Sequence, residues 1–123
     1  MPLPRPSRRF ALSGLIALSL CPAAAQAHAI LLASVPQAGA SVPAGAATLK
    51  FRFNSRVDHD RSRLTLIGPD GGETVLKIAR GTDDEVLASH AELMPGAGAV
   101  RWQVLAVDGH ITRGEVAFIV LER

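Results

Sequence analysis

Apolar and polar residues alternate in short stretches of this chain, most clearly in three of them: residues 48–54, 99–107 and 115–121. In the first stretch Leu49, Phe51 and Phe53 fall on one face, while polar and charged residues fall on the other. A period of two residues is the period of a β-strand that buries one face. The pattern therefore predicts three half-buried strands.

Weaker patterns predict four further strands, at residues 29–33, 63–68, 73–79 and 85–89. The apolar segment near Leu93 is one more weak candidate for a strand. The sequence Pro-Asp-Gly-Gly at residues 69–72 supplies the fixed and positive φ angles of a turn, so the two strands that flank it are expected to form a hairpin. The remaining segments, rich in Gly, Pro and Ala or lying between strands, are expected to be loops: residues 36–46, 94–98 and 108–114.

About seven short strands separated by turn signals, with no convincing helix, favour an antiparallel β-sandwich. Four aromatic residues lie on the predicted inward faces of the strands: Phe51, Phe53, Trp102 and Phe118. Large apolar side chains at such positions are usually buried, so we expect them in the core rather than in a binding surface. The chain without its first 27 residues is long enough for one domain with a modest hydrophobic core.

Residues 1–27 have the three-part composition of a secretory signal. Basic residues come first, an apolar run follows at residues 10–20, and small residues end in an A-x-A pattern at Ala27. The apolar run is about half of the roughly 20 residues that span a bilayer, so no integral membrane segment is expected after cleavage. We expect a cleaved signal peptide at residues 1–27 and a single domain at residues 28–123.

Removal of the signal changes what the composition implies. Three of the 13 Lys and Arg residues and none of the 11 Asp and Glu residues precede residue 28, which leaves 10 basic against 11 acidic groups. A net charge near −1 gives no reason to expect nucleic-acid binding. The one cysteine, Cys21, also lies in the signal, so disulfides and thiolate metal sites are excluded from the mature domain.

Nitrogen and oxygen donors at two places in the chain predict a metal site. Cleavage after Ala27 would make His28 the first residue, and its free α-amine and imidazole would give a metal two nitrogens. Asp108 and His110 are two residues apart, so their side chains share one side if this segment is extended. Amine, imidazole and carboxylate donors suit Cu(II), whereas a Cu(I) site would need several methionines and Met94 is the only one after the initiator.

Simpler interpretations exist for each part of this donor set. His28 could be an ordinary chain terminus, and the Asp-Gly pair at residues 108–109 could be only a turn. His59, between two aspartates, is expected in a solvated loop, and His90 is expected on the surface. The sequence has no Gly-rich phosphate loop, nucleophile elbow or metalloprotease helix, so no enzyme is expected.

The chain resembles the CopC family of periplasmic copper-binding proteins over almost all of the predicted mature domain. The motifs that carry the resemblance are His28-Ala29 with Leu32, Ser34-Val35-Pro36-Gln37-Ala38-Gly39-Ala40, Leu49-Lys50-Phe51-Arg52-Phe53-Asn54 with Val57, Trp102-Gln103-Val104, and Asp108-Gly109-His110 with Gly114. The resemblance implies a Greek-key β-sandwich or barrel of the immunoglobulin or cupredoxin-like kind. It also implies a Cu(II) site formed by the amine and imidazole of His28, the carboxylate of Asp108 and the imidazole of His110.

The function implied by the resemblance is periplasmic copper sequestration, copper resistance, or delivery to an inner-membrane copper importer of the CopD type. Two features depart from the family. Residues 71–94 contain one methionine where some members have a methionine-rich Cu(I) loop, and Ser55 stands where some members have a glutamate. Two alternatives remain open: a copper-dependent oxidative enzyme, since some oxygenases use an amine and two imidazoles, and a metal-free immunoglobulin-like interaction module.

Overall fold

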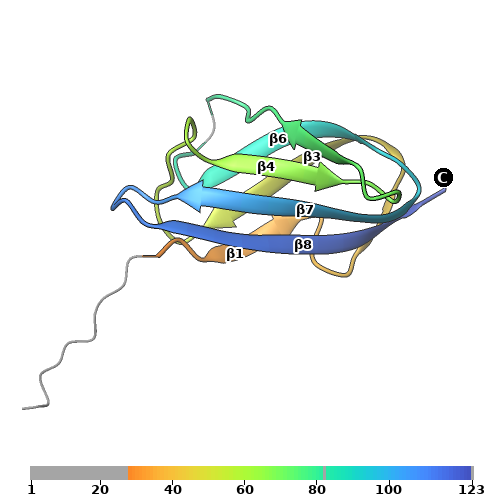
Figure 1. Ribbon diagram of the computed structural model, residues 1–123, viewed down its shortest axis with the longest axis horizontal. Coiled ribbons are helices and arrows are strands. Elements are labelled where there is room, and N and C mark those ends of the chain that lie inside the picture. Colours follow the sequence, from red (N-terminus) through yellow and green to blue (C-terminus); the bar gives the residue numbers. More distant parts are fainter. Residues whose placement is uncertain (1–27, 82, 123) are drawn as a thin grey trace, which may run out of the picture.

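Eight β-strands make up most of the computed structural model, which describes residues 28–81 and 83–122 (Figure 1). The strands are β1 Leu31–Val35, β2 Ser41–Pro43, β3 Gly45–Phe53, β4 Arg63–Ile67, β5 Glu73–Leu76, β6 Val86–Leu93, β7 Gly96–Leu105 and β8 Ile111–Leu121. These described residues form no helix, and so contain none that is long and apolar enough to cross a membrane. The all-β prediction is confirmed, whereas the signal peptide predicted for residues 1–27 lies outside the described residues.

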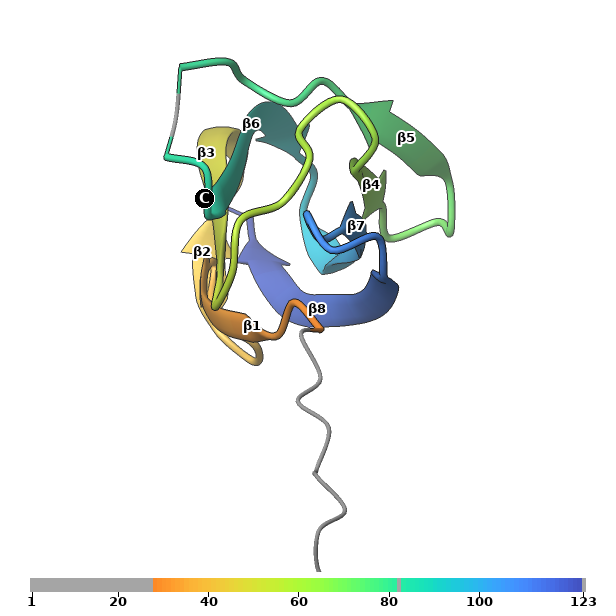
Figure 2. The ribbon, with the colours of Figure 1, turned by 90° about the vertical axis from the view of Figure 1, so that its left-hand side faces the viewer.

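The strands form two sheets that pack face to face, as the end view in Figure 2 shows. One sheet has the order β1-β3-β6 and the other has the order β2-β8-β7-β4-β5. All strand pairs are antiparallel except β2 with β8, which is parallel. The chain passes from one sheet to the other after β1, β2, β3, β5 and β6, and the predicted Greek-key sandwich is confirmed.

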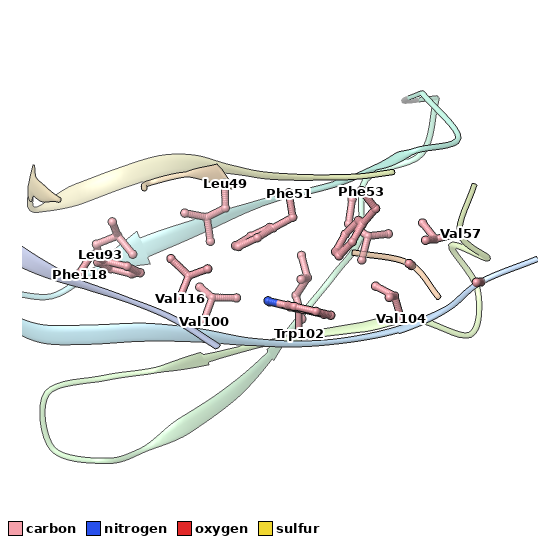
Figure 3. Packing of buried hydrophobic residues seen from close by; sticks show 14 of the residues in the cluster. Leu49, Phe51, Phe53, Val57, Leu93, Val100, Trp102, Val104, Val116 and Phe118 are labelled. Atoms are coloured by element: carbon pink, nitrogen blue, oxygen red, sulfur yellow. The ribbon is translucent and has the colours of Figure 1, made fainter. Parts of the chain in front are cut away.

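The core lies between the sheets and contains the side chains that the alternating pattern placed inward. Leu49, Phe51 and Phe53 of β3 are fully buried, and they face side chains of β7 and β8 (Figure 3). The ring of Phe53 meets the indole of Trp102 edge to face, with the ring centroids 5.2 Å apart. Each such side chain contributes about 1.5–3 kcal/mol through burial, so the alternation along β3 explains why this face of the strand packs in the core.

All three predicted loops differ in part from the structure, each in a segment that contains glycine. The predicted loop at residues 36–46 contains β2 and the start of β3, because β2 pairs with residues 119–121 of β8. The predicted turn at residues 94–98 is shorter, since β7 begins at Gly96. Pairing with a distant strand, rather than local alternation, determines these elements.

The segment at residues 108–114, predicted as a connection, also differs. Strand β8 begins at Ile111, and Gly114 lies inside it, opposite Trp102. A glycine that suggested a turn is needed here for space, since a Cβ atom on Gly114 would lie only 2.7 Å from Cε2 of Trp102. The actual connection between β7 and β8 is therefore a short turn at residues 106–110.

Candidate metal centre

The turn between β7 and β8 determines how Asp108 and His110 are presented. Gly109 has a φ of 94°, a left-handed conformation that favours glycine. The amide of Gly109 donates to the carbonyl of Ala106 at 2.8 Å, and the amide of Ala106 donates to the carbonyl of His110 at 2.9 Å. The assumption that this segment is extended was therefore wrong, and the Asp-Gly turn that was the alternative is what forms.

The turn nevertheless brings the two predicted side chains into contact. Oδ2 of Asp108 lies 3.0 Å from Nδ1 of His110, and Oδ1 accepts a hydrogen bond from the His110 backbone amide at 3.1 Å. An ionised carboxylate can only accept, so Nδ1 of the ring carries the proton. In the neutral ring this leaves the lone pair on Nε2 for a metal, and the His110 side chain is 60% exposed.

The carboxyl of Asp108 has a pKa below its ordinary value of 3.8, chiefly because the His110 backbone amide donates to it and secondarily because the His110 ring does. Because the pKa is lowered, the ionised carboxylate stabilises the folded protein at any pH above the ordinary pKa of 3.8. This contribution to the free energy of unfolding is lost as the pH falls through the lowered pKa. We expect a carbon-detected NMR titration of the metal-free protein to give Asp108 a midpoint below 3.8, and His110→Ala to raise it. A midpoint at or above the ordinary value in the wild-type protein would contradict the geometry of the turn.

His28 lies beside this turn although it is far away in the sequence. Its ring meets the ring of His110 edge to face, with centroids 5.0 Å apart. The next residue, Ala29, is only 2% exposed and is part of the core. The hydroxyl of Thr112 donates to the Ala29 carbonyl at 2.9 Å, which connects the first described residues to the start of β8.

The predicted residues thus lie together at one end of the sandwich, but they do not form a finished site. Within residues 28–81 and 83–122, no three metal-ligating side chains converge closely enough to hold an ion. The carboxylate of Asp108 is directed at Nδ1 of His110. Both histidines are exposed, however, so a metal ion can approach their rings from solvent, and a metal–imidazole bond is roughly 2 Å long. Imidazole and carboxylate donors without sulfur fit Cu(II).

The other two histidines of the chain lie apart from this pair. His59 lies in a loop, as expected, but it is half-buried rather than fully solvated, and its Nε2 lies 2.7 Å from the carbonyl of Val86. His90 is exposed on β6, where Nδ1 lies 3.2 Å from Oγ1 of Thr48. The surface position expected for His90 is confirmed.

Two residues near the candidate centre could not be assigned a role from their place in the sequence. Asn54, the last residue of the alternating stretch, accepts a hydrogen bond from the amide of Ile30 at 2.8 Å. Thr112 belonged to a segment expected to be a loop. No local pattern identifies either contact, since Thr112 and Ala29 are 83 positions apart. Ser55 is half-buried, and its Oγ has no hydrogen-bond partner among the described residues.

Comparison with known proteins now decides the family. Residues 31–121 match the CopC domain. The chain belongs to the CopC family. Protein YobA of Escherichia coli K12 is 31% identical over 118 residues, covering 93% of this chain and 94% of YobA. Structural similarity agrees with the sequence match, so the resemblance that the motifs indicated is confirmed.

Two solved structures share this CopC fold. CopC from Methylosinus trichosporium OB3b superposes with a TM-score of 0.71 at 26% identity, covering 78% of this chain and 96% of that one. PcoC, a methionine-rich copper resistance protein from Escherichia coli, superposes with a TM-score of 0.62 at 28% identity, covering 76% and 99%. These relatives support a copper-related role for this CopC chain. Its methionine content does not match that description of PcoC, since the sequence has only two methionines.

Proposed function

We propose that this chain is a periplasmic Cu(II)-binding protein whose site forms when export and cleavage make His28 the first residue. The observation that supports the proposal best is the contact between the His28 and His110 rings, with centroids 5.0 Å apart. The donors would be the amine and imidazole of His28, the imidazole of His110 and the carboxylate of Asp108. The α-amine supplies the donor that side chains alone do not provide.

The chemistry of these donors favours Cu(II) over Cu(I). Nitrogen and oxygen ligands in a tetragonal arrangement suit Cu(II), whereas Cu(I) prefers thiolates and thioethers. Met94, which is 60% exposed, follows β6 at the end of the sandwich opposite the β7–β8 turn. Acid should weaken binding, because the amine and both imidazoles must lose their protons to bind the metal.

The exposure of the site suits a protein that passes copper on or stores it reversibly. The side chain of His110 is 60% exposed and that of Asp108 is 29% exposed, so a partner could approach the bound ion directly. Delivery to a CopD-type membrane importer, or sequestration that confers copper resistance, would both use such an open site. A binding role, rather than catalysis, accounts for these features.

The N-terminus of the exported protein tests the proposal. We expect the intact mass of protein recovered from the periplasm to correspond to a chain that starts at His28. Acetylation of the His28 α-amine should weaken Cu(II) binding at least 100-fold, on the order of the loss of a direct metal ligand, because the resulting amide offers no lone pair to the metal. Isothermal titration with a competing chelator measures this loss, and the same protein with a free α-amine is the matched control. A different mature start, or equal affinity with and without the acetyl group, would refute the proposed donor set.

A further inference from the structure

Side chains from both sheets hold the main chain directly after His28. Thr112, in β8, donates its hydroxyl proton to the Ala29 carbonyl at 2.9 Å. Asn54, which follows β3, accepts a hydrogen bond from the Ile30 amide through its side-chain Oδ1 at 2.8 Å. The backbone amide of Asn54 donates to the Ile30 carbonyl at 3.0 Å. Ala29 itself is buried, with 2% of its surface exposed. The hydrogen bonds fix the peptide groups that follow Ala29 and Ile30, and burial holds the Ala29 methyl group.

This arrangement leaves His28 little freedom apart from the φ angle of Ala29 and its own torsion angles. Thr112 lies two residues after His110, so one short segment, the end of the turn and the start of β8, carries one imidazole and fixes the chain that carries the other. First residues of a domain usually fray unless side chains or sheet pairing fix them. A frayed His28 would have to be ordered each time a metal bound, and that ordering would reduce the affinity.

We propose that Thr112 and Asn54 are positioning residues of the Cu(II) site: they hold His28 within reach of His110 and thereby raise the affinity without touching the metal. The inference rests on the proposed function and adds the residues that organise its site. In this proposal Asn54 and Thr112 raise the Cu(II) affinity by holding His28 near His110, in addition to stabilising the fold.

Thr112→Val removes the hydroxyl and keeps the size and β-branching of the side chain. We expect it to raise the Cu(II) dissociation constant of the mature protein about tenfold or more, as is typical when a residue that orients a metal ligand is lost. Thr112→Ser, which keeps the hydroxyl, should bind nearly as well as the wild-type protein. Asn54→Ala is the second variant and should act in the same direction if Thr112→Val folds poorly. Unchanged affinity in both Thr112→Val and Asn54→Ala would overturn the inference.

A double-mutant cycle with His110→Ala separates positioning from a general loss of stability. Without His110, the amine and imidazole that remain belong to one residue, so holding that residue in place has no further benefit. Thr112→Val should then change the residual affinity by less than about twofold. An equal loss in the presence and absence of His110 would overturn the positioning role.

A measurement without copper gives an independent result. We expect nuclear Overhauser contacts between the ring protons of His28 and His110 in the metal-free mature protein, and their loss in Thr112→Val. Thr74→Val, at an exposed position of β5, makes the same chemical change and should alter neither the contacts nor the affinity. If the wild-type protein fails to bind Cu(II), the proposed function is wrong. Contacts between the His28 and His110 rings that persist in Thr112→Val would refute the positioning role of Thr112.

Discussion

Replacing His110 with alanine is expected to weaken Cu(II) binding by on the order of 100-fold or more, because a direct ligand should matter at least as much as the partners that orient one. The change removes one of the two imidazoles that lie 5.0 Å apart. It also removes the ring that holds the Asp108 carboxylate at 3.0 Å. The donors on His28 would remain, but they form only part of a tetragonal set. A competition titration against a coloured Cu(II) chelator at constant pH measures the loss.

The remaining histidines provide matched controls for this prediction. His90→Ala changes an exposed residue on β6 and should leave the Cu(II) affinity unchanged. His59→Ala removes a ring that lies 2.7 Å from the Val86 carbonyl, so it should lower stability while changing affinity little. Trp102 is the only tryptophan in a chain without tyrosine, so its fluorescence reports whether each variant is folded. Equal losses of affinity for His59→Ala, His90→Ala and His110→Ala would show that the wrong histidines were chosen.

The sandwich could be predicted wherever one strand face is buried. From residue 48 to the end of β3 the inward residues are fully buried and the outward ones exposed, so a period of two is present in the sequence. Strand β2 gave no such signal, since it has three residues and pairs in parallel with the far end of β8. Its existence depends on contacts that no local window contains, which is why residues 36–46 were taken as a loop.

The candidate centre was predictable in its residues and not in its geometry. The positions of His28, Asp108 and His110 indicated nitrogen and oxygen donors, but the left-handed conformation of Gly109 replaced the extended segment that was assumed. The contact between the two histidine rings depends on how β1 and β8 lie in opposite sheets. Contacts of this kind arise from the packing of the whole domain, and residue spacing does not determine them.

The contact between Gly114 and Trp102 is also one that residue spacing does not reveal. Substitution of Gly114 is expected to have the largest effect on stability. The residue lies opposite Trp102 in the β7–β8 ladder, and the indole covers the position where a side chain would begin. A Cβ atom there would lie 2.7 Å from Cε2 and 3.0 Å from Nε1 of Trp102. The indole N–H is buried and has no hydrogen-bond partner in the part of the chain that the structure describes. Packing against Gly114 and Phe53, rather than a hydrogen bond, therefore holds the ring in place.

Gly114→Ala is expected to lower the free energy of unfolding by about 3 kcal/mol, the upper part of the usual range for overpacking a core. For a domain of this size, a loss of that magnitude lowers the melting temperature by roughly 10–20 °C. Thermal unfolding followed by circular dichroism measures it. Gly68→Ala is the control, since its Cβ would make only an ordinary contact of 3.4 Å with Asp70. Because leucine lacks the clashing indole atoms, Trp102→Leu should cost less in the Gly114→Ala protein than in the wild type. Strict additivity of the two losses would show that the clash is relieved elsewhere.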